Sequence, residues 1–392
     1  MSAQTAPSDG SPQPAARTTP LVEVHRELGG TLVDFAGYLM PLRYGSETAE
    51  HHAVRASAGI FDISHMGEIF VTGSQAPQAL DHALVGLPSG LDPGRARYTM
   101  IVTPDGGVID DLIVYRLSGH GFLVVANAAN AAVVAAELTE RAAGFDAVVS
   151  DESDKYALIA VQGPKAQEIV QRLTQTDLPA LKYYALVSGV VAGHQAFIGR
   201  TGYTGEDGFE LFVAAEDAEP VWRALTEAGG ADLTPCGLSA RDTLRLEAGM
   251  PLYGHELTRD TTPYDAGLGR VVRLEKPDFV GREALAAIAE AGPAHRLVGL
   301  VARGRRVPRA GYTVIGDDGE PCGTVTSGAP SPTLGRPVAM ASVRVDARPA
   351  AVDIRGKHEE VDVVDLPFYH REHRPAGGAD QVSAHQNKRT NK

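Results

Sequence analysis

The feature that most constrains the fold of this chain is a change in sequence pattern near Pro293. Before this point, short stretches of alternating apolar and polar residues predict strands, and helical patterns are interleaved with them. The predicted strands cover residues 67–73, 108–117, 121–127, 156–163 and 208–215. After this point, short strands separated by Gly, Pro and Asp-Gly turns follow one another with almost no helical period. That second pattern is typical of a small antiparallel barrel or sandwich.

Helical patterns in the first region alternate irregularly with the strands. They cover residues 46–58, 129–143, 164–173, 219–228 and 237–248, and an Ala-rich stretch at 282–291 resembles a connecting helix. The first begins with a possible Ser cap and acidic residues, and the third begins with Pro, as helix starts often do. Because the alternation is irregular and many turns resemble hairpins, we expect an α+β fold rather than a regular parallel α/β fold.

The two ends of the chain differ in composition from the rest. Residues 1–18 are rich in Pro, Ser and Ala, and residues 376–392 are also polar and poor in large apolar side chains. Such segments cannot bury enough apolar surface to offset the entropy of ordering, so we expect both to be disordered. The structured chain should therefore divide into a body at 19–285 and a C-terminal domain at 293–374.

Composition also limits the partners that the chain can have. Its 392 residues include 36 Lys and Arg against 49 Asp and Glu, a formal net charge of −13, which argues against non-specific binding to nucleic acid or anionic membranes. Only Cys236 and Cys322 are present, far apart, so neither a disulfide framework nor a structural zinc site is expected. The first twenty residues lack the apolar core of a signal peptide, and no apolar run approaches the roughly 20 residues that span a bilayer. We therefore expect a soluble, cytoplasmic protein.

Several familiar catalytic and nucleotide-binding motifs are missing. The chain has no Gly-rich loop followed by Lys and Ser or Thr, and no G-x-S-x-G elbow. The stretch GRTGYTGEDG (199–208) leads into a strand, so it lacks the helix N-terminus that a dinucleotide site needs. His51 and His52 are adjacent and cannot form the i, i+4 pair of a helical zinc site. These absences count against a hydrolase, a kinase or a dehydrogenase.

One segment that could carry chemistry is the predicted hairpin at 97–117. Its second strand begins with Asp110 and Asp111, and neighbouring side chains in a strand face opposite sides. We therefore expect that one aspartate can point to solvent while the other points inward. From the residues alone, polar strand-end residues beside a turn are the commoner explanation.

Two further segments carry polar groups of uncertain use from the residues alone. In RTGYTGEDGFE (200–210), Tyr203 offers a flat apolar ring with a hydroxyl, and Glu210 would need a donor partner if it faced inward. A solvent-facing Glu210 is equally consistent with the alternation. In the predicted helix at 237–248, Arg241 and Arg245 lie one turn apart, which is more often a solvated helix face than an anion site.

Taken together, these segments resemble the glycine cleavage T-protein family over nearly the whole structured chain. In the order of the family, the matching segments are DFAGYLMPLRY (34–44), FDISHMGEI (61–69), GGVIDDLIVYR (107–116), VVANAAN (124–130), VQGP (161–164), RTGYTGEDGFE (200–210), GLSARDTLRLEAGMPLYGHEL (237–257) and DFVGREAL (278–285). The C-terminal region matches through residues 303–312, 323–328 and 366–369. The resemblance implies a multi-domain folate-binding α+β fold, with two interleaved subdomains in 19–285 and a C-terminal antiparallel β-barrel.

The resemblance also implies an activity. Proteins of this family are tetrahydrofolate-dependent aminomethyltransferases of glycine catabolism and one-carbon metabolism. They move the aminomethyl carbon from the lipoyl arm of H-protein to tetrahydrofolate, giving 5,10-methylenetetrahydrofolate, ammonia and the reduced lipoyl arm. The implied partners are lipoylated H-protein, with the P- and L-proteins of the same system, and tetrahydrofolate as co-substrate. Neither a metal nor pyridoxal phosphate is implied, because folate is the acceptor.

Residue by residue, the resemblance places the key aspartate of the family at Asp111, as the candidate catalytic group. The implied folate contacts are Tyr98, Asn127, Tyr203, Glu210, Arg241 and Tyr369. Their chemistry is consistent with these roles: a carboxylate beside the reacting folate nitrogen can accept a proton and stabilise positive charge. A glutamate and an asparagine can pair with the pterin amide edge, and an arginine with a carboxylate or pterin oxygen.

Two alternatives share this scaffold. One is a folate-dependent demethylase that acts on a small methylated substrate. The other is a non-catalytic folate-binding protein of iron–sulfur assembly, but that group carries a motif near K-G-C-Y-x-G-Q-E, where this chain has MPLYGHEL (250–257) without cysteine. Asp111 also favours an active transferase.

Overall fold

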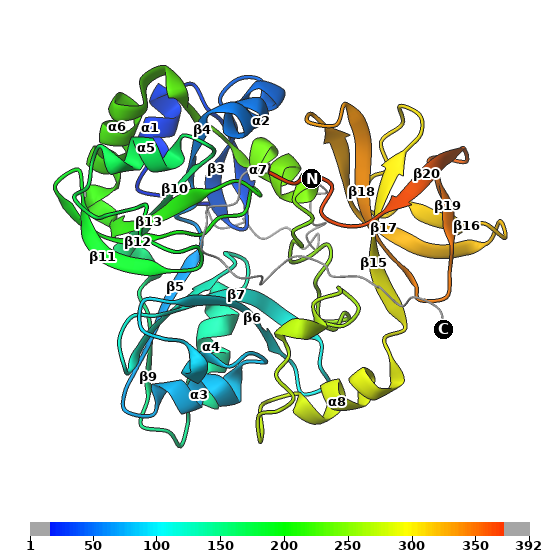
Figure 1. Cartoon of the computed structure of the whole chain (residues 1–392), viewed down its shortest axis with the longest axis horizontal. Coiled ribbons are helices and arrows are strands. Elements are labelled where there is room, and N and C mark those ends of the chain that lie inside the picture. The colour runs from blue at the N-terminus through cyan, green and yellow to red at the C-terminus, as the bar shows by residue number, and fades with distance from the viewer. Residues whose placement is uncertain (1–15, 372–392) are drawn as a thin grey trace, which may run out of the picture.

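A computed structural model describes residues 16–371 of the chain (Figure 1). Its elements form two lobes of mixed sheet and helix, with a separate barrel beside them. The expected disorder of 376–392 and of most of 1–18 lies outside the described residues. The expected boundary at Thr19 is corrected, because Arg17–Thr18 form strand β1 and pair in parallel with Tyr38 and Leu39.

The first lobe contains a six-stranded sheet and the small sheet to which β1 belongs. The small sheet has the order β1-β3-β2, with β2 (Thr31–Phe35) and β3 (Tyr38–Arg43). The large sheet has the order β11-β12-β13-β10-β4-β14 and is antiparallel except where β14 joins β4. Its strands are β4 (Ala58–Asp62), β10 (Tyr156–Gln162), β11 (Leu186–Val191), β12 (His194–Gly199), β13 (Gly208–Ala214) and β14 (Leu233–Pro235).

Helices cover this lobe and bury its main core, in which Trp222 is 1% exposed. They are α1 (Val22–Glu27), α2 (Glu47–Ala56), α5 (Ala166–Gln171), α6 (Ala218–Gly229) and α7 (Leu238–Glu247). The predicted cap of the 46–58 helix is confirmed, because the hydroxyl of Ser46 accepts a hydrogen bond from the backbone N–H of Ala49 at 3.3 Å.

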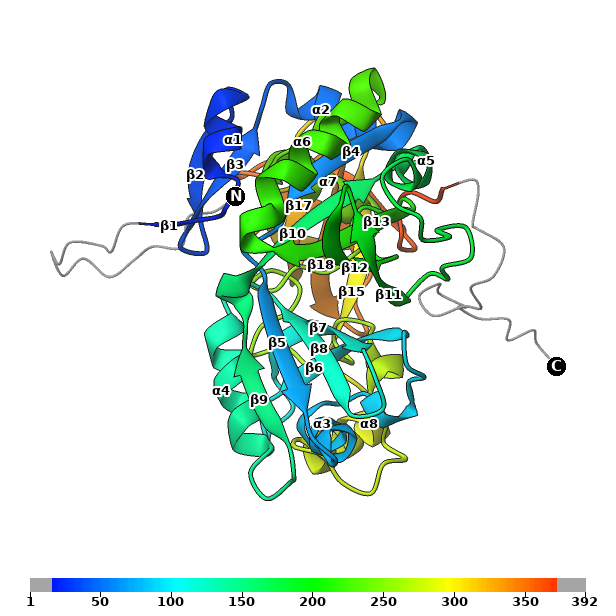
Figure 2. The same ribbon diagram turned by 90° about the vertical axis from the view of Figure 1, so that its left-hand side faces the viewer.

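The second lobe is an antiparallel five-stranded sheet with the order β6-β7-β8-β5-β9, and it lies below the first lobe in Figure 2. One face packs against its own helices, and the other faces the six-stranded sheet, where Ile113 and Val125 meet Ala160 and Phe212. Its elements are β5 (Gly67–Thr72), β6 (Ala96–Val102), β7 (Val108–Arg116), β8 (Gly121–Ala126), β9 (Val148–Asp151), α3 (Ala76–Ala83) and α4 (Ala131–Arg141).

After α8 (Arg282–Ala291), the C-terminal strands close into an antiparallel barrel with the order β15-β18-β17-β16-β19-β20. The barrel rather than the sandwich is therefore the fold of this domain. Its strands are β15 (His295–Ala302), β16 (Thr313–Gly316), β17 (Pro321–Ser331), β18 (Arg336–Arg344), β19 (Pro349–Asp353) and β20 (His358–Val364). After β20 the chain returns to the first lobe, where the N–H of Tyr369 donates to the carbonyl of Glu247 at 2.9 Å.

The predicted strands and helices of the body are confirmed to within a few residues at their ends. The helices α1 and α3 and the strands β2, β3, β4, β9, β11, β12 and β14 were not predicted. Short 3-10 turns complete the fold: η1 (Pro88–Gly90), η2 (Ser153–Lys155), η3 (Ala215–Asp217), η4 (Gly230–Asp232) and η5 (Gly269–Val271). Within residues 16–371, no helix is long and apolar enough to cross a membrane.

Candidate active site

Asp111 lies on β7, on the face of the five-stranded sheet that meets the other lobe. Its cross-strand partner is Met100, and Tyr98 precedes that partner by two residues on the same face of β6. The hydroxyl of Tyr98 donates to Oδ2 of Asp111 at 3.0 Å. Burial raises the pKa of Asp111 above its ordinary value, although the hydrogen bonds that it accepts oppose the shift. The structure thus holds a half-buried carboxyl group that takes up a proton more readily than an exposed aspartate.

Asn127, at the end of β8, holds both aspartates. Its side-chain N–H₂ group lies 2.9 Å from Oδ1 of Asp110 and 2.9 Å from Oδ1 of Asp111, and its backbone N–H donates to Asp110 at 2.9 Å. Asp110 is 0% exposed and Asp111 is half-buried, so Asp110 is the aspartate of the pair that points inward. The reason is that Asn127 and Asn130 supply donors inside the lobe, which compensates the buried carboxylate.

Tyr203 and Arg241 face each other from the loop before β13 and from α7. The guanidinium carbon of Arg241 lies 4.8 Å from the centre of the Tyr203 ring, a cation–π contact. Burial raises the pKa of Tyr203, and the charges of Asp111 and Arg241 act on it in opposite directions. Among the described residues, the half-buried guanidinium of Arg241 makes no hydrogen bond or ion pair, so its donors are free.

The loop that carries Tyr203 has a conformation that depends on its neighbours and its glycines. Gly205 has φ of +81°, a backbone conformation that residues with a Cβ atom rarely adopt. Gln162 accepts from the hydroxyl of Thr204 at 2.9 Å and donates to the carbonyl of Thr201 at 3.0 Å. The loop is therefore fixed by buried side-chain contacts on β10 and not by solvent-exposed turns.

Glu210, on β13, faces the interface between the two sheets. Its Oε2 accepts from the hydroxyl of Thr201 at 2.5 Å and from the hydroxyl of Tyr115, on β7, at 3.3 Å. Tyr115 shares a face of β7 with Asp111, so Glu210 and Asp111 border the same space between the sheets. No described residue donates to Oε1 of Glu210. The solvent-facing alternative for Glu210 is therefore wrong, and one carboxylate oxygen is free to accept from a ligand.

Tyr369 is the predicted contact that lies apart from the others. Its ring covers the guanidinium of Arg55, 3.9 Å from the guanidinium carbon, and burial followed by the Glu206 carboxylate raises its pKa to about 12. The described contacts of Tyr369 join it to this cluster, and not directly to Asp111. Tyr369 thus lies beside the other predicted site residues, on the barrel side of α7. Those residues form a central group of six: Tyr98, Asp111, Asn127, Tyr203, Glu210 and Arg241.

Sequence reasoning missed or misjudged two basic residues beside the site. Arg245 is 1% exposed and pairs with Glu256 at 2.9 Å and Asp242 at 2.8 Å, so the solvated-face interpretation of the two arginines is wrong. His65 is 3% exposed, and burial followed by the charge of Arg241 lowers its pKa to about 4. The helical spacing could not reveal this burial, because Arg245 also donates to Ser327 of the barrel, 82 positions away.

No group of three or more His, Cys, Asp or Glu side chains in the described part of the chain is arranged to hold a metal ion. The groups available to a ligand are instead the carboxyl of Asp111, Oε1 of Glu210, the guanidinium of Arg241 and the two tyrosine rings. An anionic heteroaromatic molecule with amide-type donors and acceptors would match this set.

Comparison with known proteins identifies the chain. Two family models match consecutive regions: the GCVT N-terminal domain over residues 21–276 and the glycine cleavage T-protein C-terminal barrel domain over residues 295–370. An aminomethyltransferase of Streptomyces avermitilis is 64% identical over 370 residues, which cover 91% of this chain and 99% of that protein. An aminomethyltransferase of Bacillus subtilis is 44% identical, again with 91% and 99% covered.

A solved structure agrees with these matches. The crystal structure of glycine cleavage system aminomethyltransferase T from Bartonella henselae superposes with a TM-score of 0.85 at 37% identity, covering 90% of this chain and 98% of that one. The matches confirm the predicted multi-domain α+β fold and the resemblance seen in the sequence. The chain therefore belongs to the glycine cleavage T-protein family.

Proposed function

We propose that this protein is the aminomethyltransferase that passes the aminomethyl carbon from a lipoyl arm of H-protein to tetrahydrofolate. The products are 5,10-methylenetetrahydrofolate, ammonia and the reduced lipoyl thiol. The observation that carries the proposal is the pair of groups left free on the first lobe, Oε1 of Glu210 and the guanidinium of Arg241, together with the carboxyl of Asp111 on the facing sheet. The names of the 44–64% identical relatives support it.

Each side chain has a role that follows from its contacts. Asp111 accepts a proton from the attacking folate nitrogen and stabilises the positive charge that develops on the methylene carbon, because its raised pKa makes it a stronger base. Tyr98 and Asn127 fix the Asp111 carboxyl from its two oxygens. Two carbon–nitrogen bonds form, to N5 and N10 of the folate. They replace the carbon–sulfur bond to the lipoyl arm and the carbon–nitrogen bond to the amino group, and the two folate N–H protons end on the departing thiol and ammonia.

The remaining residues bind and orient the acceptor. Glu210 accepts from pterin N–H groups through its free oxygen, and Arg241 donates to a carboxylate or a pterin oxygen. The rings of Tyr98 and Tyr203 provide apolar contact area, and Tyr369 contributes from the barrel side. Neither a metal nor pyridoxal phosphate has a role in this scheme, since folate itself accepts the carbon.

The family implies a lipoylated partner, and we propose H-protein in that role, within a system that also contains the P- and L-proteins. The demethylase and the iron–sulfur assembly protein are not favoured. The matched curated relatives are named aminomethyltransferases, and the matches cover nearly their whole length.

The test is ammonia release from aminomethylated H-protein. We expect release that depends on both tetrahydrofolate and the protein, with stoichiometric formation of 5,10-methylenetetrahydrofolate. Dimethylated and monomethylated amines, incubated with the protein and tetrahydrofolate, provide the comparison. Formation of 5-methyltetrahydrofolate from the methylated amines, with no product from H-protein, would replace this proposal with the demethylase.

A further inference from the structure

Arg55, on α2, is a buried arginine that none of the sequence motifs singled out. Its side chain is 8% exposed, and the two carboxylates that it meets are 4% and 1% exposed. A guanidinium buried this deeply is stable only when its donors are satisfied. The donors of Arg55 are used on two separate segments of the chain, and a third segment covers its face.

The first segment is the loop that carries Tyr203. Arg55 Nη1 donates to the backbone carbonyl of Thr204 at 2.7 Å and to the Glu206 carboxylate at 2.9 Å. These contacts hold the residues directly after Tyr203. A bond to the carbonyl next to Tyr203 fixes the backbone from which its ring projects towards Arg241.

The second segment is α7, which carries Arg241. Arg55 donates from Nη2 to the carbonyl of Leu244 at 3.4 Å and to the Glu247 carboxylate at 3.0 Å. The side chain of Arg55 therefore bridges the Tyr203 loop and the C-terminal half of the helix on which Arg241 lies. It joins the two elements whose side chains form the cation–π pair of the site.

The third segment is the chain end after the barrel. The Tyr369 ring lies over the Arg55 guanidinium at 3.9 Å, and the N–H of Tyr369 donates to the carbonyl of Glu247 at 2.9 Å. A planar guanidinium can use its edges for hydrogen bonds and its face for this stacking at the same time, which an ammonium cannot do.

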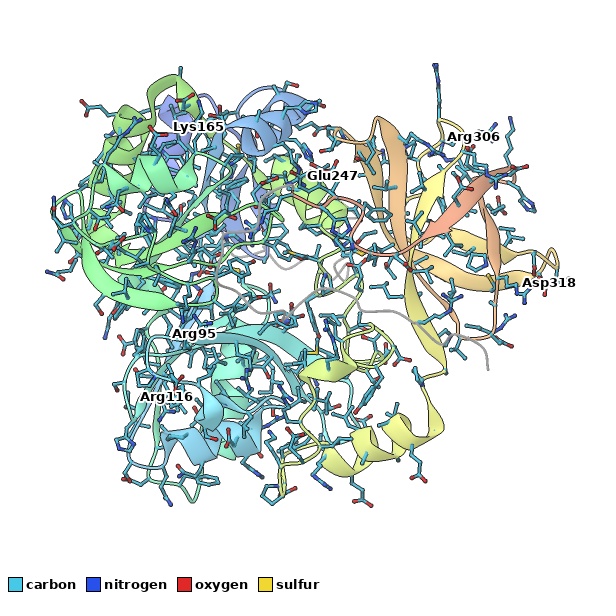
Figure 3. All side chains as sticks on the ribbon, in the orientation of Figure 1. Arg95, Arg116, Lys165, Glu247, Arg306 and Asp318 are labelled. Atoms are coloured by element: carbon cyan, nitrogen blue, oxygen red, sulfur yellow. The ribbon has the colours of Figure 1, made fainter. Side chains whose placement is uncertain are left out.

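Glu247 extends the same cluster to the barrel, and Figure 3 shows it where α7 approaches the barrel strands. Its carboxylate accepts from the hydroxyl of Ser331 at 2.5 Å and from the hydroxyl of Thr333 at 2.7 Å. His51 Nε2 lies 3.1 Å from the same carboxylate. The barrel and the chain end that follows it are thus attached to the body at Arg55 and Glu247.

We propose that Arg55 is a positioning residue for folate binding, which holds Tyr203, Arg241 and Tyr369 in one arrangement. The proposal rests on the proposed function, since those three residues are its expected folate contacts. Arg55 touches three segments that each carry one of them. Among residues 16–371, none of its hydrogen bonds, ion pairs or ring contacts reaches the five-stranded sheet that carries Asp111. Loss of its geometry should therefore weaken folate binding and leave the chemical step largely intact.

The test uses Arg55→Lys in the full chain. Lysine keeps the positive charge between the two carboxylates, so the variant should fold, but it cannot reproduce the forked contacts or the stacking on Tyr369. We expect the Kd of tetrahydrofolate, measured by fluorescence titration without H-protein, to rise about tenfold, because small misplacements of binding groups are costly. At saturating folate, kcat should stay within about threefold of the wild type.

Arg141→Lys is the matched control. Arg141 is also a buried arginine, with hydrogen bonds to Glu137 and to the carbonyls of Ala83 and Val102, but its partners lie inside the second lobe. This control should lower the thermal midpoint and leave the Kd of tetrahydrofolate unchanged. An equal rise of Kd in both lysine variants, or no rise in Arg55→Lys, overturns the positioning role.

A second variant makes the test independent of the folding of Arg55→Lys. Glu206→Gln keeps the side-chain shape and all other charges but weakens the hold of Arg55 on the Tyr203 loop, and it should also raise the Kd of tetrahydrofolate. An unchanged Kd in Glu206→Gln contradicts the inference. If the wild type binds no tetrahydrofolate, the proposed function is wrong. If the wild type binds tetrahydrofolate and the variants bind it equally well, only the positioning role of Arg55 is wrong.

Discussion

Replacing Asp111 with asparagine removes the proposed proton acceptor and nearly preserves the shape of the side chain. Oδ1 of Asp111 accepts from Asn127 at 2.9 Å, and Oδ2 accepts from the hydroxyl of Tyr98 at 3.0 Å. An asparagine can keep the first bond with its amide oxygen and donate to the phenol oxygen of Tyr98 in place of the second. Because both partners stay satisfied, we expect the free energy of unfolding to change by less than about 1 kcal/mol.

The expected loss lies in turnover. General base catalysis by a positioned side chain contributes about 10²–10⁴ in rate, so kcat of Asp111→Asn should fall by about that factor. The folate contacts on the first lobe are unchanged, and the Kd of tetrahydrofolate should stay within a few-fold of the wild type. Ammonia release from aminomethylated H-protein gives kcat, fluorescence titration gives Kd, and urea unfolding gives stability.

The neighbouring aspartate provides a matched control with the opposite signature. Asp110 is 0% exposed and accepts from the backbone N–H of Asn127 at 2.9 Å and the side chain of Asn130 at 2.8 Å. In Asp110→Asn, one oxygen becomes an N–H₂ group that faces a donor, which should cost about 1–3 kcal/mol of stability. Because Asp110 cannot touch a substrate, its asparagine variant should keep most of the activity of the protein that remains folded.

The pH dependence of turnover gives an internal check on the same reasoning. A proton acceptor works only when it is unprotonated, and burial raises the pKa of Asp111. The rate should therefore fall as the pH is lowered through a value above the ordinary range of an aspartate, about 3.9, and this acid limb should be absent in Asp111→Asn. Turnover of Asp111→Asn within about tenfold of the wild type would refute the catalytic assignment. An equal loss of activity in folded Asp110→Asn would refute it as well.

Three further substitutions test other parts of the site and its support. Glu210→Gln puts an N–H₂ group where the free Oε1 lies, so the Kd of tetrahydrofolate, measured by titration, should rise about 10–100-fold with little change in stability. Glu68 is 1% exposed, and burial, followed by the charge of Asp151, raises its pKa, so its ionisation opposes folding above the ordinary glutamate pKa. The stability advantage of Glu68→Gln over the wild type, measured by urea unfolding, should therefore grow between pH 5 and pH 8. A difference that stays constant with pH would contradict the raised pKa. Arg245→Met leaves the buried Glu256 carboxylate unpaired and should cost about 3–5 kcal/mol, seen as a lower thermal midpoint; a loss under 1 kcal/mol would contradict the buried pair.

Much of the fold and part of the site could be predicted because the signals are local. Tyr98 and Asp111 lie 13 positions apart on one hairpin, and strand alternation places them on the same face of the sheet. The Ser46 cap and the change of pattern before the barrel are likewise readable from neighbouring residues. Where the spacing of apolar residues predicted a helix or a strand, that helix or strand was confirmed.

The remaining features depend on contacts between distant segments. Arg55 meets Glu206 and Glu247 across 151 and 192 positions, so no local pattern marks it as part of the site. Arg245 has the spacing of a solvated helix residue, and it is buried only because Glu256 and the barrel residue Ser327 fold onto it. Tertiary contacts of this kind override the exposure that a helical pattern predicts, and composition does not reveal them.

The arrangement places the proposed catalytic carboxyl and the polar folate contacts Glu210 and Arg241 on different lobes. Asp111, with Tyr98 and Asn127, belongs to the five-stranded sheet, whereas Glu210 and Arg241 belong to the first lobe, to which Arg55 attaches the barrel. If the two sets act independently, substitutions in the first should lower kcat, and substitutions in the second should raise Kd. Glu210 is the point where the sets meet, because Tyr115 of the five-stranded sheet donates to it at 3.3 Å. A combined Asp111→Asn and Glu210→Gln variant should therefore show any coupling between folate orientation and catalysis as a departure from additive free energies, whereas Asp111→Asn with Arg55→Lys should be additive.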